Sequence, residues 1–254
     1  MLNIIAIYNL PEKKETLAET LAVAMNSTVY EALARLKAPG RGPLVVGTSA
    51  ALGQAEETVT RLRASGFHGV LLKDEDVEGE ADRFAVRRFK LNSDGLNVES
   101  GPGKSLNVDY GSIRLILRGT SIAQTTLTET VKEKKFDPGM ALLTGGLKMT
   151  KTTEKIVEST TQAREGFFNL YAEKQQTLVF REGGLVYDSL GPALQPTRQA
   201  NFSYLIKELR RLSPEAVYDD RLLSRAGQVQ LLGPSLCPEK HLDIATSLLE
   251  KLLA

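Results

Sequence analysis

Hydrophobic and polar residues follow two different periods along this chain, and the change falls at residues 79–83. Residues 1–78 contain short apolar runs separated by segments whose apolar residues recur at helical spacing. The runs predict strands and the spaced segments predict helices, while Thr28 and Glu31 have the spacing of a capping box. The predicted strands cover residues 2–8, 44–47 and 67–72, and the helical apolar positions are Leu17, Leu21, Ala24, Val29, Leu33, Leu36, Ala55, Val59 and Leu62. The order is β-α-α-β-α-β, and crossovers of this length favour parallel neighbouring strands with helices packed on the sheet.

From residue 84 onward the pattern is the alternation typical of strands. SDGLNVESGPG, at residues 93–103, returns in altered form as EGGLVYDSLGP at residues 182–192. In both copies a glycine permits a tight turn, apolar residues alternate after it, and Gly-Pro ends the strand. The alternation predicts core positions at Leu96, Val98, Leu185 and Tyr187 and exposed carboxylates at Glu99 and Asp188. The repeat therefore indicates two hairpins of one barrel, or two related subdomains, rather than a ligand site used twice.

Two helices and one insertion complete the predicted architecture. Phe202, Leu205, Ile206, Leu209 and Leu212 form an apolar stripe on one helix, and Leu242, Ala245, Leu248, Leu249 and Leu252 form another. Residues 119–164 are rich in threonine and predict two long exposed strands, which pair as a ribbon or with another subunit. We expect an α+β protein with an α/β domain at residues 1–78, a linker at 79–83, a β-rich barrel-like or sandwich domain with a capping helix at 84–234, and a C-terminal helix at 235–254.

Composition removes several classes of function. The formal net charge is +1, from 32 Lys and Arg against 31 Asp and Glu, so nothing predicts a nucleic-acid partner. Cys237 is the only cysteine, which excludes an intramolecular disulfide and a multi-cysteine metal site. We expect no metal and no cofactor. The first residues lack a secretory signal and no apolar stretch is long enough to span a bilayer, which favours a cytoplasmic protein.

Two parts of the chain resemble known families. YEALARLKAPGRGPLVV, at residues 30–46, and RLRASGFHGVLL, at residues 61–72, make the N-terminal part similar to the C-terminal domain of the ribosomal stalk protein and to the Clp protease adaptor fold. This resemblance implies a partner-binding module without catalysis. FKLNSDGLNVESGPGKSLNVDYGSIRLI, at residues 89–116, and NFSYLIKELRRL, at residues 201–212, make residues 84–213 resemble bacterial pleckstrin-homology-like domains.

Two groups of residues are candidate ligand contacts. Arg87, Arg88, Lys90 and Arg114 lie on the early strands of the β-rich domain, where they could receive a phosphate or an acidic peptide or be solvated side chains. The same cluster leaves peripheral contact with an anionic membrane open. Alternatively, Gly47, Ser49 and Gly53 could form a phosphate-binding turn at the start of a helix.

The leading functional hypothesis is a non-catalytic binding or adaptor protein that acts through protein contacts, including self-association. It rests on the two histidines and one cysteine of the chain, which assemble no familiar acid–base constellation. The alternative is a small-molecule- or nucleotide-binding protein, or an enzyme, with a site between the domains near residues 47–53.

Overall fold

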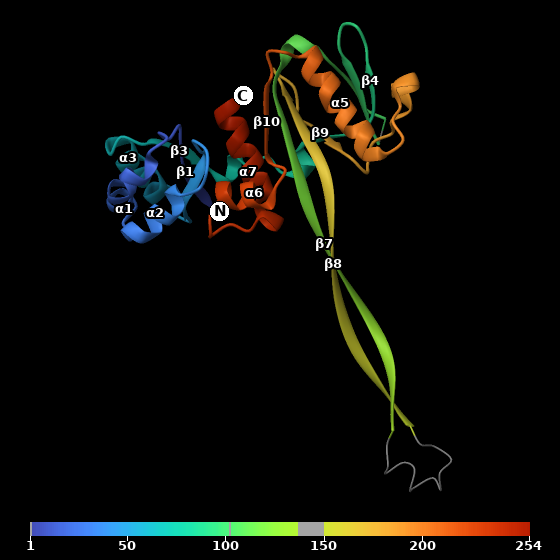
Figure 1. Ribbon diagram of the computed structural model, residues 1–254, viewed down its shortest axis with the longest axis horizontal. Coiled ribbons are helices and arrows are strands. Elements are labelled where there is room, and N and C mark those ends of the chain that lie inside the picture. Colours follow the sequence, from blue (N-terminus) through green and yellow to red (C-terminus); the bar gives the residue numbers. More distant parts are fainter. Residues whose placement is uncertain (1, 102, 137–149) are drawn as a thin grey trace. The chain divides into compact units, whose positions relative to one another are not determined.

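The computed structural model describes the backbone of residues 2–101, 103–136 and 150–254, and the side chains of these residues outside 122–163. Its N-terminal elements are β1 (Asn3–Tyr8), α1 (Ala18–Met25), α2 (Val29–Leu36), β2 (Leu44–Ser49), α3 (Leu52–Ala64) and β3 (His68–Leu72). They are followed by β4 (Phe84–Leu91), β5 (Leu96–Ser100), β6 (Ser105–Val108), β7 (Ile113–Phe136), β8 (Thr150–Ala172), β9 (Leu178–Arg181), α5 (Arg198–Leu212), β10 (Val217–Leu222), α6 (Arg225–Leu232) and α7 (Pro238–Leu253). Figure 1 shows these elements coloured along the sequence.

The N-terminal elements occur in the predicted order, and the capping box of Thr28 and Glu31 starts α2. The expected parallel pairing of neighbouring strands is wrong. The sheet has the order β2-β1-β3, and β1 is antiparallel to both of its neighbours. The reason is that the two helices α1 and α2 return the chain to the sheet in the opposite direction. The single helix α3 then connects β2 and β3, which run parallel to each other on either side of β1.

Strand β1 is buried on both faces, as its continuous apolar sequence predicts. Ile5 and Ile7 pack with the core residues of α1, α2 and α3. Ile4 and Ala6 belong to a different core cluster, which includes residues of α6 and α7. The three-stranded sheet therefore contributes to two hydrophobic cores, one on each face.

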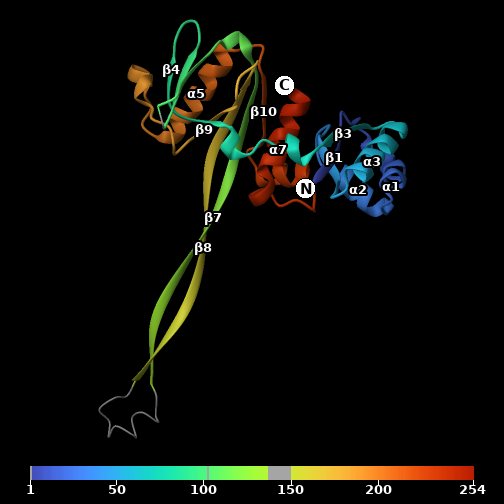
Figure 2. The ribbon, with the colours of Figure 1, turned by 180° about the vertical axis from the view of Figure 1, so that it is seen from behind.

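The second sheet contains seven strands in the order β10-β7-β8-β9-β4-β5-β6. This confirms an α+β class with a β-rich second part. Helix α5 packs its buried side chains, including Phe202 and Leu205, into the core on one face of the sheet, and both views show it beside β4 (Figures 1 and 2). The expected barrel is not seen in the described residues, because β10 and β6 remain at opposite edges of an open strand order.

The repeated sequence forms a hairpin in its first copy only, where β5 pairs antiparallel with β4. The prediction of a second hairpin is wrong, because Val186 makes a single isolated parallel bridge and a 3-10 helix, Asp188–Ala193, follows it. The two copies lie on either side of β4 near Arg88. Strand β5 pairs with β4 on one side, where Arg88 faces Glu99. On the other side Val186 forms a bridge with Arg88 and donates its N–H to the carbonyl of Arg87. All four predicted core residues are buried, and Glu99 and Asp188 are exposed as predicted.

The Thr-rich insertion contains long strands, as the sequence predicts. β7 and β8 are neighbours in the sheet, and together they include residues 113–136 and 150–172. Residues 122–164 form a compact unit of their own, and the rest of the chain forms a second unit. The connection over residues 137–149 lies outside the described residues.

Candidate functional site

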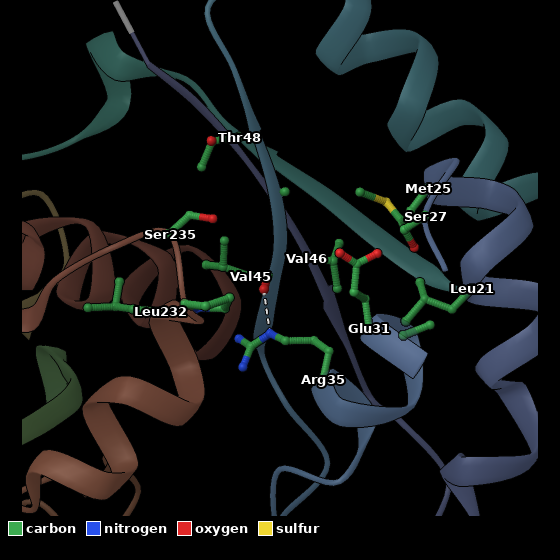
Figure 3. Close-up of a pocket in the computed structure, with 13 residues that line it drawn as sticks. Leu21, Met25, Ser27, Glu31, Arg35, Val45, Val46, Thr48, Leu232 and Ser235 are labelled. Carbon is green, nitrogen blue, oxygen red and sulfur yellow. Dashed lines mark hydrogen bonds between the residues drawn. The ribbon is translucent and has the colours of Figure 1, made fainter. Parts of the chain in front are cut away.

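A cavity of about 250 Å³ lies along strand β2, which is an edge strand of the three-stranded sheet. Figure 3 shows its wall, in which α1 contributes Leu21 and Met25, and α2 contributes Glu31 and Arg35. Leu232 at the end of α6 and Ser235 in the segment after it complete the labelled wall on the other side of β2. The remaining lining residues are Ser27, Ala32, Val45, Val46, Gly47, Thr48 and Pro234. We call this cavity the β2-edge groove. Most of its wall is apolar, with one carboxylate and one guanidinium.

Arg35 crosses the edge of β2 at one end of the groove. Its Nε donates to the carbonyl of Val45 at 2.6 Å, the contact drawn in Figure 3. Its Nη1 donates to the carbonyl of Gln230, and its Nη2 donates to that of Leu231 at 2.6 Å. The last two acceptors belong to the C-terminal turn of α6, where carbonyls lack partners within the helix and carry the negative end of the helix dipole. Arg35 therefore satisfies one carbonyl of the sheet edge and caps α6.

Neither charged side chain of the groove is suited to proton transfer near neutral pH. Burial lowers the pKa of Arg35 to about 10, which leaves the guanidinium charged. Hydrogen bonds from the backbone N–H and the hydroxyl of Thr28 lower the pKa of Glu31, which stays ionised. The hydroxyl groups of Ser27, Thr48 and Ser235 have no histidine beside them in the lining. This arrangement offers a ligand one fixed charge of each sign and three hydroxyl groups.

The three residues of the predicted phosphate-binding turn do not form one turn, because two of them belong to β2 and the third belongs to α3. Gly47 lies inside β2, where a Cβ atom would come within 2.8 Å of Cε of Met25, so this glycine permits close packing of α1. Ser49 ends β2 and its Oγ accepts the N–H of Ala51 at 3.2 Å. Gly53 lies in the first turn of α3 with open space around it. Only Gly47 lines the β2-edge groove.

The second predicted group is only partly brought together. Arg88 and Lys90 line a separate cavity of about 290 Å³ whose wall also contains Glu99 and Asp188. The bulge between Val86 and Arg88 leaves Arg87 exposed, but Arg87 is not part of this lining. Arg114 is engaged elsewhere, because its Nε donates to Glu173 at 3.0 Å. Two cations and two carboxylates give this cavity no excess of either charge, so an anionic ligand gains little there.

Comparison of the chain with protein-family models, curated proteins and solved structures found no match. Across the described residues, no cluster of three or more His, Cys, Asp or Glu side chains is placed to hold a metal ion. A search of the same residues finds no helix with the length and apolar character needed to cross a membrane. The geometry of the chain itself therefore carries the functional argument.

Proposed function

We propose that this chain is a non-catalytic binding protein that takes up an extended segment of a partner protein in the β2-edge groove. The observation that supports it is the position of the groove beside a strand that has β1 as its one neighbour in the described sheet. An edge strand presents unpaired N–H and C=O groups, which an added strand can bind. Main-chain hydrogen bonds then give affinity, and the adjacent cavity selects a side chain.

The size and wall of the groove favour a peptide side chain over a whole cofactor. Its volume of about 250 Å³ is below the roughly 300–1,000 Å³ that is common for pockets of drug-sized ligands. Leu21, Met25 and Leu232 give it apolar surfaces, so the segment it accepts carries a large apolar side chain at the central position. Arg35 already closes the edge at Val45, which leaves residues 46–48 for strand addition.

Helix α2 beside the groove also displays apolar side chains to solvent. Tyr30 is 80% exposed, and Val29 next to it is 48% exposed. Exposed large apolar residues that gather in one region are typical of interaction surfaces. The N-terminal part of the sequence also resembles partner-binding modules, which supports the same proposal.

A peptide-display selection with the full chain tests the proposal. We expect enriched peptides with apolar residues at alternate positions, because alternate side chains of an added strand face the groove. Met25→Lys should abolish binding of the selected peptides, since it places an ammonium group in the apolar wall. Val23→Lys is the matched control: it lies two residues away on the same helix, adds the same charge, and should leave binding unchanged.

Binding that is lost in Val23→Lys but kept in Met25→Lys would place the contact on the exposed surface of α1. That result would contradict binding in the β2-edge groove. Failure to enrich any alternating sequence would contradict strand addition itself. Thermal unfolding of both variants is measured alongside, because Met25 is half-buried and its replacement must leave the fold intact for the comparison to count.

Self-association through the Thr-rich strands is a second proposal, favoured by the length of β7 and β8. A two-stranded ribbon is at best marginally stable in water when it packs on nothing else. A second copy of the chain against residues 122–164 would provide such packing.

A further inference from the structure

A basic pocket of about 340 Å³ lies at the C-terminal end of α5, away from the residues that line the β2-edge groove. Its lining consists of Lys207, Arg210, Arg211, Ser213, Pro214, Ala216 and Tyr218. Lys207 is three and four residues before the two arginines, so all three cations lie on the same side of the helix. No carboxylate takes part in this lining, unlike that of the cavity beside Arg88 and Lys90.

The cations are only partly neutralised. Arg211 forms an ion pair with Glu208, with 2.9 Å between Nη2 and Oε2. Lys207 and Arg210 make no ion pair with any described residue. Three like charges at this spacing on one helix repel one another, and a bound anion would remove that repulsion.

Arg210 is held in a fixed orientation by an aromatic side chain. Its guanidinium carbon lies 3.9 Å from the centre of the Tyr218 ring. Tyr218 is itself packed against the core cluster beneath α5. A guanidinium stacked in this way keeps its N–H groups at the rim of the plane, where they can bind two oxygens of a phosphate group.

Ser213 supplies the observation that points to a ligand. The residue is 3% exposed, yet its Oγ has no hydrogen-bond partner among the described residues. Its backbone is already fixed, because its N–H donates to Leu209 and its carbonyl accepts from Ala216. A buried hydroxyl without a partner costs free energy, and Ser213 is among the residues that line the basic pocket.

We propose that this pocket binds a phosphate group, held by Lys207, Arg210 and the hydroxyl of Ser213. The favourable effect of cations on a helix C-terminus accounts for Arg210 and Arg211 in the last turn. It does not account for the unpartnered Ser213 hydroxyl or for the stacked guanidinium. The phosphate group can belong to free inorganic phosphate or to a lipid headgroup, and the experiment below distinguishes these sources.

Calorimetric titration of the full chain with inorganic phosphate, in a buffer of constant ionic strength, measures the site. We expect saturable binding to one site. Lys207→Gln with Arg210→Gln should weaken it at least tenfold. Arg61→Gln is the matched control, because it removes one exposed cation from α3 and should change the affinity less than twofold. Ser213→Ala leaves the charge unchanged and should weaken binding severalfold.

A parallel arm measures sedimentation with phosphatidylcholine vesicles with and without phosphatidic acid. One supporting result is that the chain binds vesicles with phosphatidic acid, that Ser213→Ala loses this binding, and that free phosphate does not bind. This result supports the site and shows that the phosphate group it binds belongs to a lipid headgroup. Absence of binding in both arms overturns the proposal. An equal change in affinity in Ser213→Ala and Arg61→Gln also overturns the proposal, because it would show that anions are attracted to the positive charge of the chain in general and not to this pocket. If Ser213→Ala does not fold, the proposal is tested by comparing two phosphate affinities. One is that of the Lys207→Gln, Arg210→Gln double variant, whose changes are at exposed residues, and the other is that of the Arg61→Gln control.

Discussion

Replacing Arg35 by methionine should cost a large part of the stability of the chain. Methionine keeps most of the apolar stem but removes three hydrogen bonds to carbonyl groups. A hydrogen bond from a charged donor contributes about 1.5 kcal/mol at the lower end of its range, so three sum to about 4.5 kcal/mol. Removing a desolvated charge returns part of this. We therefore expect a loss of about 3 kcal/mol in the free energy of unfolding.

Chemical denaturation measures the global loss, and amide hydrogen exchange locates it. The C-terminal turn of α6 should exchange faster, because the carbonyls of Gln230 and Leu231 lose their cap. Arg63→Met is the matched control, since Arg63 donates a single hydrogen bond, from Nε to the carbonyl of Gly69 at 3.0 Å, and should cost about 1 kcal/mol. Equal losses in the two variants, or unchanged exchange in α6, would refute the role assigned to Arg35.

Three further predictions concern other parts of the chain. Arg83→Met should destabilise the chain by about 3 kcal/mol in denaturant unfolding, because the Arg83 side chain is 7% exposed and bonds to Glu78 and Asp243; a loss below about 1 kcal/mol would contradict this. Burial raises the pKa of Glu250 above its ordinary 4.5, so its contribution to stability is fully present below pH 4.5 and is lost as the pH rises through the folded-state pKa. Glu250→Gln should remove this fall in the free energy of unfolding at higher pH and should not change that free energy below pH 4.5. Denaturant unfolding at several pH values checks this, and a gain in stability of equal size at every pH would show that protonation of Glu250 is not the cause. Deleting residues 125–161 should reduce the mass in solution by light scattering to that of the monomer, whereas an oligomer of unchanged number would exclude the Thr-rich strands as its interface.

Local patterns predicted the individual elements well, because the forces that set them act within a few residues. The capping box at Thr28 starts α2, and the apolar spacing of α3 buries Ala55, Val59 and Leu62 as expected. Strand direction and sheet closure were missed because they depend on distant parts of the chain. The parallel pairing of β4 with β9 joins Phe84 to Leu178, and no local pattern contains that information.

The candidate site was harder to predict for the same reason. Arg35 reads as an ordinary helical residue in YEALARL, and its acceptors in α6 are 195 and 196 residues away in the sequence. The Gly47 region did attract a prediction, but for a phosphate turn rather than for an edge strand beside a groove. Lys207, Arg210 and Arg211 were visible as the polar side of a helix, yet the Ser213 hydroxyl acquires significance only through its burial. Charge pattern alone therefore pointed to Arg87, Arg88, Lys90 and Arg114 and not to the cluster on α5.

Amide hydrogen exchange of the chain with and without a peptide selected by display tests the central claim most directly. Strand addition at the β2-edge groove predicts that at least one amide within residues 46–48 becomes strongly protected when the peptide binds, since antiparallel and parallel ladders both use main-chain N–H groups of the edge strand. That protection should disappear in Met25→Lys and persist in Val23→Lys. Binding with unchanged exchange at residues 46–48, and with new protection confined to α1 and α2, would contradict the account.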